Sequence, residues 1–271
     1  MRQRSRGTGG FGIRIIIAVV IGIFSLISYF SSQQTNPITG EKQYLTLTPE
    51  QEIALGLQAA PELINEYGGL YQDQEIQDLI DEIGERLVNE SVARDTPWEF
   101  EFYVLDDRDT INAFALPGGQ VFITTALLAE FENDDQIAGV LGHEIVHVLA
   151  RHSAQRIAKS ELTNGLIGAV GVASGNASAT QTAAMIGQMI NMSYGREDEL
   201  ESDSLGVCLM LDAGYDPRGM LSVQEILAAS GGGGQPEFAS SHPSPENRLA
   251  RIQEAIDNAD TICPRIEASA R

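Results

Sequence analysis

The chain has 271 residues, of which 43% are apolar and 6% aromatic, so it is long and apolar enough to bury a sizeable core. Seventeen Lys and Arg residues against 38 Asp and Glu residues give a formal net charge of −21. Such a chain repels a phosphate backbone, and its basic residues cluster only at the N-terminus. Nucleic acid is therefore not an expected partner.

Residues 1–32 are predicted to form an N-terminal membrane anchor or signal segment. Arg2, Arg4, Arg6 and Arg14 precede an uncharged apolar run from Ile15 to Phe30. This run is shorter than the roughly twenty residues that cross a bilayer, but its flanks extend it. We find no small-residue cleavage site and no lipid-accepting cysteine after it, so an uncleaved anchor is favoured over a cleaved signal.

Residues 33–47 are polar and rich in turn-forming types, and we interpret them as a tether to one domain over residues 48–271. That domain opens with a helix signal, because Thr48 offers an N-cap and Pro49 suits the first helical position. A second helix is expected at about 73–91, where apolar residues recur every three or four positions.

The apolar period changes to two over residues 98–125, which predicts a small antiparallel sheet. Its last two strands are expected to form a hairpin at Pro117-Gly118-Gly119. The remaining elements are predicted helices at about 123–131, 134–158, 180–193, 196–213, 217–229 and 245–257. The fold class is therefore α+β and mainly helical.

Two features leave alternatives open. Residues 165–190 are rich in small residues but too often interrupted by polar ones to cross a bilayer. They indicate either a mobile flap or loosely packed helix over a site, or a plain buried core helix. Cys208 and Cys263 form either one disulfide or two small buried side chains.

The stretch "GVLGHEIVHVLARH" holds three of the four histidines. His143 and His147 are four residues apart, so on a helix they project from one face and can hold one metal ion. Glu144, beside them, can reach a metal-bound water as a general base. The helix is otherwise apolar, and buried polar groups without partners are costly. His152 is interpreted as a helix-end or packing residue and Arg151 as an ion-pair former.

A third ligand is available in "GREDELESDSLG", where Glu199 and Asp203 are four residues apart. On pattern alone, Glu197 and Glu201 compete with Glu199 for that role. Asp203 suits a carboxylate that orients a ligating histidine. His242, far along the chain, is a further candidate near the centre. Two histidines, one glutamate and an open position form a hydrolytic zinc arrangement, so one Zn²⁺ per chain is the predicted cofactor.

These motifs carry a resemblance to a known family. Across residues 36 to 258, the segments "NAFALPGGQVFITTALL", "LGHEIVHVLARH", "SYGREDELESDSLG" and "SHPSPENRL" resemble the zinc peptidases that include HtpX, the CAAX prenyl endopeptidases, the mitochondrial Oma peptidase and BepA. The resemblance implies a zincin-like peptidase domain over residues 48–271, with Glu199 as the third zinc ligand and Asp203 as the aspartate of the same motif. This sequence departs from the family pattern at Ser202 and Gly195, where alanine and serine are usual.

The resemblance further implies a zinc-dependent endopeptidase of the bacterial cell envelope, anchored in the inner membrane with its catalytic domain on the periplasmic or another extracytoplasmic side. Its substrates would be unfolded or extended polypeptides, which pair with an edge strand at Asn112, Ala113, Phe114 and Ala115. His242 would restrain activity from near the zinc, or donate to the oxyanion. Two rival interpretations remain: a membrane-tethered chaperone or assembly factor with latent peptidase activity, and a binding module with purely structural zinc.

Overall fold

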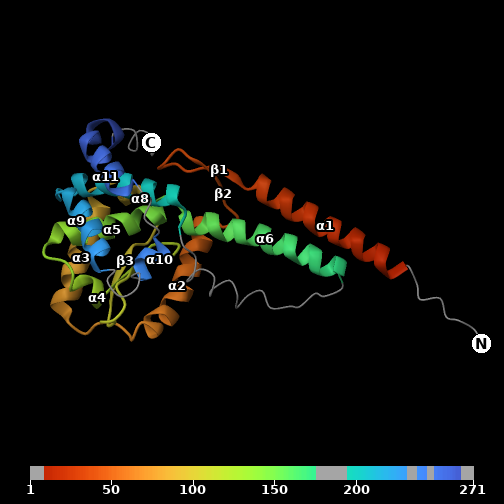
Figure 1. Ribbon diagram of the computed structural model, residues 1–271, viewed down its shortest axis with the longest axis horizontal. Coiled ribbons are helices and arrows are strands. Elements are labelled where there is room, and N and C mark those ends of the chain that lie inside the picture. Colours follow the sequence, from red (N-terminus) through yellow and green to blue (C-terminus); the bar gives the residue numbers. More distant parts are fainter. Residues whose placement is uncertain (1–8, 175–193, 231–236, 243–246, 264–271) are drawn as a thin grey trace, which may run out of the picture. The chain divides into compact units, whose positions relative to one another are not determined.

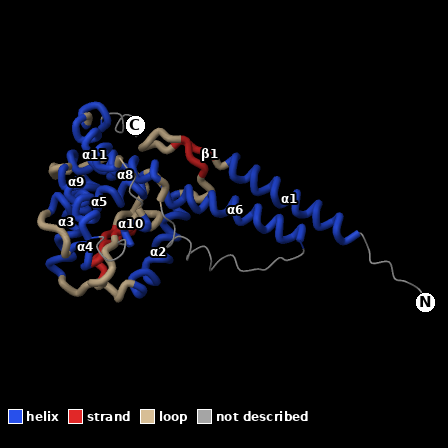
Figure 2. The backbone as a smooth tube through the Cα atoms, in the orientation of Figure 1, coloured by secondary structure: helices blue, strands red, loops and turns tan. Residues whose placement is uncertain are grey.

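The computed structural model describes residues 9–174, 194–230, 237–242 and 247–263, and it divides the chain into two compact units. Unit 1 comprises residues 1–35, 42–47 and 154–190, and unit 2 comprises residues 36–41, 48–153 and 191–271. Figure 1 shows the helices and strands of both units, and Figure 2 colours them by type.

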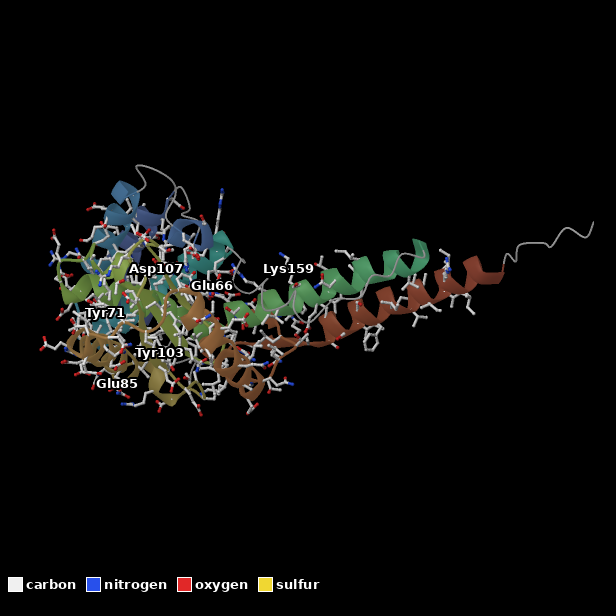
Figure 3. The ribbon with its side chains drawn as sticks, turned by 90° about the horizontal axis from the view of Figure 1, so that it is seen from below. Glu66, Tyr71, Glu85, Tyr103, Asp107 and Lys159 are labelled. Carbon is white, nitrogen blue, oxygen red and sulfur yellow. A yellow bond between two sulfur atoms is a disulfide. The ribbon has the colours of Figure 1, made fainter. Side chains whose placement is uncertain are left out.

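Unit 1 contains α1 (Gly9–Ser31), the strands β1 (Gln33–Thr35) and β2 (Lys42–Tyr44), and most of α6 (His152–Ser174). Residues 12–31 of α1 form the one helix, among the described residues, that is long and apolar enough to cross a membrane. A cleavable signal can have the same length and apolar composition, so this helix fits both interpretations of the N-terminus. Lys159 marks the polar part of α6 (Figure 3).

The segment predicted as a tether contains regular structure. β1 and β2 pair antiparallel, and the Tyr44 ring stacks on Tyr29 of α1 with centroids 4.6 Å apart. Aromatic stacking of this kind stabilises the hairpin against the helix. Composition alone does not predict it, because the polar residues of this short hairpin resemble those of a loop.

The centre of unit 2 is α5 (Asp134–Leu149), in which every residue from Gln136 to Leu149 is buried. Helices α3 (Gln74–Asn89), α8 (Arg196–Asp212) and α9 (Arg218–Ser230) pack against it. Gly206 of α8 lies close to its neighbours, because a Cβ built there would lie 2.7 Å from Met220 Cε and 3.4 Å from the backbone nitrogen of His143 on α5. Glu66 and Glu85, labelled in Figure 3, are exposed, whereas Glu52, Glu144, Glu199 and Asp203 are buried.

A three-stranded sheet lies beside α3 and α5, in the order β3-β5-β4. The strands are β3 (Glu101–Leu105), β4 (Ala113–Ala115) and β5 (Gln120–Thr124). β4 and β5 form the expected antiparallel hairpin, but β3 and β5 run parallel, so the expectation of a wholly antiparallel sheet is wrong in this pairing. β5 lies between β3 and β4 in the sheet. Side chains alternate between the two faces of a strand in parallel and antiparallel sheets alike, so the sequence pattern does not distinguish the two pairing directions.

The sheet is held in register by a row of aromatic rings. Phe122 on the central strand stacks on Tyr103 of β3 and on Phe114 of β4, in each case with centroids 5.0 Å apart. Tyr103 is labelled in Figure 3. Directly opposed aromatic pairs of this kind contribute to sheet stability beyond their buried area.

Most predicted helices are confirmed within a few residues. The first is α2 (Pro49–Glu66), which begins with a capping box formed by Thr48 and Gln51. The helix expected over 134–158 is instead two helices, because Arg151 has a left-handed backbone with φ of 55° between α5 and α6. The short elements are η1 (Val92–Asp95), α4 (Thr125–Leu128) and α10 (Glu237–Ser241). α11 (Arg248–Asp257) follows, and residues 259–263 are again helical.

Two expectations fall wholly or partly outside the described residues. The helix at 180–193 does so entirely, and of the segment 165–190 only residues 165–174 are described, as the end of α6. The choice between disulfide and free thiols is settled, since Cys208 of α8 and Cys263 beyond α11 are joined by a disulfide.

Candidate metal centre

α5 brings the two histidines of the HEIVH sequence together as their spacing predicts. The Nε2 atoms of His143 and His147 lie 3.0 Å apart, and both side chains are buried. One helical turn separates the residues, so both imidazoles project from the same face. Their ε nitrogens therefore point to one common position.

α8 and the residue after α10 complete the group. Glu199 Oε2 lies 3.4 Å from His143 Nε2, and Glu199 Oε1 lies 3.6 Å from His147 Nε2. His242 Nδ1 lies 3.1 Å from Glu199 Oε1. The four side chains are buried and offer ligand atoms that all lie within 4.8 Å of one another. This arrangement gathers residues that are up to 99 positions apart.

Asp203, one turn after Glu199, lies behind His143. Its Oδ1 is 2.9 Å from His143 Nδ1, so the imidazole donates its δ proton there and keeps the ε lone pair for the centre. Arg248 holds the same carboxylate through Nε, 2.7 Å from Oδ2, and Nη2, 2.9 Å from Oδ1. The paired carboxylate is therefore fixed by two hydrogen bonds from one guanidinium group.

The carboxylates make the centre favourable for positive charge. Burial alone would lower the pKa of His143, but hydrogen bonds and charge from Asp203 and Glu199 raise it to about 9. Burial would raise the pKa of Glu199, yet the neighbouring His242 and His143 hold it well below its usual range. A divalent cation benefits from the same potential, so protons compete with it as the pH falls.

Glu144 occupies the centre without a hydrogen bond. It is fully buried, and neither of its carboxylate oxygens has a hydrogen-bond partner among the described residues. Burial raises the pKa of this carboxyl group above its usual range. His242 Nε2 lies 3.5 Å from Glu144 Oε1, an ion-pair contact rather than a hydrogen bond. A buried carboxylate without a hydrogen bond is costly, and its position beside the metal-binding group indicates a chemical rather than a packing role.

The donor set fits the predicted cofactor. Imidazole nitrogens and a carboxylate oxygen are the ligands of hydrolytic zinc sites, and His143, His147, Glu199 and His242 form a group able to bind one metal ion. A bound cation would offset the negative charge that is buried in this group, and this favours binding of the ion.

The predicted substrate segment Asn112–Ala115 forms β4 and the residue before it, at an edge of the sheet. The Asn112 amide donates to the hydroxyl oxygen of Tyr67, at 3.2 Å, and to Glu237 Oε1, at 3.3 Å. Ala113 is buried, and the first residues of α10 lie against this region because Phe238 N–H donates to the carbonyl oxygen of Ile111.

Sequence reasoning missed three side chains around the centre. Arg248 lies in the segment "PENRL", but the sequence pattern assigned it no role. Tyr194, whose ring stacks on His147 with centroids 3.7 Å apart, carried no signal. His152 was interpreted as a packing residue, but its Nδ1 lies 2.9 Å from His147 Nδ1.

A mainly helical α+β domain with this centre on its innermost helix belongs among the zinc-dependent peptidases. Comparison with protein families gives the particular family. The model of "Peptidase family M48" matches residues 74–256, which contain the whole centre, and the chain belongs to that family. It is therefore a zinc metalloprotease, and the resemblance read from the motifs is confirmed.

Two characterised relatives are similar over most of this chain. The mitochondrial metalloendopeptidase OMA1 of Schizosaccharomyces pombe is 30% identical over 237 residues, which are 86% of this chain and 69% of that protein. The beta-barrel assembly-enhancing protease of Escherichia coli is 32% identical over 272 residues, 94% of this chain and 53% of that protein. The chain thus spans about half the length of the bacterial relative.

Proposed function

We propose that this metalloprotease is an endopeptidase that hydrolyses peptide bonds in unfolded or misfolded envelope proteins, with Glu144 as its general base. The observation that carries this proposal is the buried Glu144 carboxylate, which lacks a hydrogen-bond partner among the described residues and adjoins the metal-binding group, with Oε1 3.5 Å from His242 Nε2. His143, His147 and Glu199 would hold the zinc ion. A structural zinc site has no need of such a base, so the purely structural reading is disfavoured.

When bound, zinc polarises the scissile carbonyl and lowers the pKa of a water molecule. Glu144 accepts a proton from the attacking water and delivers it to the departing amine. Its raised pKa supports this role, because a general base works best when its pKa is close to the working pH. Asp203 keeps His143 oriented throughout, and Arg248 keeps Asp203 ionised and fixed.

The proposed substrate is an extended polypeptide that adds to the outer edge of β4, the last strand of the sheet. Asn112, Phe114 and Leu116 face β5 with their backbone groups, since Leu116 N–H donates to the carbonyl oxygen of Gln120 in this register. Alternation then turns the N–H and C=O groups of Ala113 and Ala115 to the outer edge. An unfolded chain can supply the complementary backbone groups, whereas a folded one has already paired them.

A latent state is the second candidate, and one observation favours it. His242 Nδ1 lies 3.3 Å from His143 Nε2, within the metal-binding group, and Phe238 of the adjoining α10 stacks on the His242 ring with centroids 4.4 Å apart. His242 can therefore act as a fourth ligand at the position that a substrate carbonyl needs. Displacement of His242 and α10 would open both the centre and the β4 edge.

The envelope location rests on α1. Its apolar part, residues 12–31, follows an arginine-rich start, and the positive-inside rule retains such residues in the cytoplasm. The rest of the chain would then lie outside the inner membrane, where the Cys208–Cys263 disulfide is stable. The name of the bacterial relative, a beta-barrel assembly-enhancing protease, fits substrates among envelope proteins.

The test is cleavage of casein by the full-length protein in detergent, with zinc content measured in parallel. We expect cleavage that chelation abolishes and zinc restores, and Glu144→Gln should bind zinc but not cleave. Glu132→Gln, at an exposed glutamate before α5, is the matched control and should behave as wild type. Undiminished cleavage by Glu144→Gln would contradict the proposal.

A further inference from the structure

We infer that His152 and Glu201 form a positioning relay that orients His147, one of the two histidines of the metal-binding group. This inference rests on the function proposed above and extends it to residues outside that group. The contacts are short and consecutive: His147 Nδ1 lies 2.9 Å from His152 Nδ1, and His152 Nε2 lies 2.9 Å from Glu201 Oε2. Both histidines are buried.

With the Nε2 lone pair of His147 reserved for the metal and His152 neutral, one arrangement of protons satisfies both contacts. A neutral imidazole carries one N–H donor and one acceptor nitrogen. If His147 offers its Nε2 lone pair to the metal, its proton is on Nδ1 and is donated to His152 Nδ1. The proton of His152 is then on Nε2, where the Glu201 carboxylate accepts it. The relay therefore fixes the tautomer and the ring angle of His147.

The relay to His147 has a counterpart in the hydrogen bond between His143 and Asp203. Asp203 accepts directly from His143, whereas Glu201 acts on His147 through the His152 ring. α8 thus supplies the Glu199 side chain to the centre and, two and four residues later, the carboxylates that orient each histidine. Hydrogen-bond partners behind a ligating imidazole raise its basicity and hold its orientation.

The backbone between α5 and α6 places His152 for this role. Arg151 adopts φ of 55°, a left-handed conformation that is uncommon for a residue with a side chain. Its guanidinium pairs with the buried Glu52, through Nε at 2.9 Å from Oε1, and lies 5.6 Å from the centre of the Trp98 ring. These contacts hold the turn that directs His152 back toward His147 rather than onward along one continuous helix.

The experiment measures zinc affinity of the full-length protein in detergent by competition with a chelator. His152→Phe keeps the ring volume but removes both hydrogen bonds, so we expect about 10- to 100-fold weaker zinc binding. His152→Gln can accept and donate at comparable positions and should recover part of that loss. Glu201→Gln should weaken binding less than His152→Phe, and Glu197→Gln, at an exposed glutamate of the same helix, should not change it.

A second readout separates orientation from packing. Cobalt is substituted for zinc and its visible d–d absorption is recorded, because the bands report ligand geometry. We expect altered bands in His152→Phe and near wild-type bands in His152→Gln, with thermal unfolding of both metal-free variants close to that of the wild type. Unchanged zinc affinity in His152→Phe would overturn the relay, as would equal losses of affinity and metal-free stability in both His152 variants. Failure of the wild type to bind zinc would instead overturn the proposed function.

Discussion

His242 Nδ1 lies 3.1 Å from Glu199 Oε1, although the two residues come from separate parts of the chain and His242 follows a helix of only five residues. The contact places an imidazole among the side chains proposed to hold zinc. In the function proposed above a substrate carbonyl approaches the same place, so we propose that His242 and substrate compete.

We therefore predict that His242→Ala raises casein cleavage. A rise of about 10-fold in kcat/KM would correspond to about 1.4 kcal/mol of closed-state stabilisation. Initial rates at several casein concentrations measure the effect, with zinc content determined for each sample. A lower rate at full zinc occupancy would show that His242 assists the reaction, as an oxyanion donor would.

Glu237 is expected to hold α10 in its closed position. Tyr67 donates its hydroxyl proton to Glu237 Oε1 at 2.6 Å, and Asn112 donates to the same oxygen. Burial and this carboxylate raise the pKa of Tyr67, so the phenol stays a donor. Tyr67→Phe should release α10 and raise casein cleavage, less strongly than His242→Ala. Equal rates for Tyr67→Phe and wild type would show that this contact does not limit opening.

The Asp203 and Arg248 pair provides a third prediction. Both side chains are almost fully buried, so Asp203→Ala removes two hydrogen bonds from a buried guanidinium, which keeps its ion pair with Glu199 at 3.3 Å, and should destabilise the protein by about 3–5 kcal/mol. It should also weaken zinc binding by about 10- to 100-fold. Chemical unfolding and chelator competition measure the two effects.

The double variant Asp203→Ala/Arg248→Met separates these effects. It also removes the buried guanidinium that lost its two hydrogen bonds to Asp203, so stability should recover in part while zinc affinity stays low. Recovery of both would show that Asp203 acts through stability rather than by orienting His143.

Gly119 is one of two positions, with Gly118, where the hairpin turn depends on glycine. Its φ is 123°, and a Cβ built there would lie 2.4 Å from the Glu99 carbonyl oxygen. We expect Gly119→Ala to lower the free energy of unfolding by about 1–3 kcal/mol. Gly168→Ala is the control, because a Cβ there meets nothing within 4 Å. Similar melting temperatures for the two variants would contradict this account of the turn.

Local patterns predicted the parts of the molecule that local physics determines. The HEIVH spacing and the apolar residues around it suffice to predict a buried helix with both histidines on one face. The hairpin at Pro117-Gly118-Gly119 follows in the same way, since the turn needs residues that tolerate positive φ.

Contacts between residues far apart in the sequence were harder to predict from the sequence alone. Pattern alone could not choose Glu199 over Glu197 and Glu201, because each is a glutamate on the same helix, and only the family motif distinguished them. The role of His152 depends on Glu201, 49 residues away, and on the left-handed turn at Arg151. The parallel pairing of β3 with β5 leaves no trace in the alternation of side chains.

The most direct test of the account compares His242→Ala with His242→Ala/Glu144→Gln, both in the full-length protein. We expect removal of His242 to open the centre, so that activity that depends on Glu144 is measured without this restraint. We predict that both bind one zinc ion and that casein cleavage falls by about 10²- to 10⁴-fold in the double variant, because Glu144 moves the protons of the reaction. Equal cleavage by the two zinc-loaded proteins would contradict the central claim that Glu144 is the general base of this peptidase.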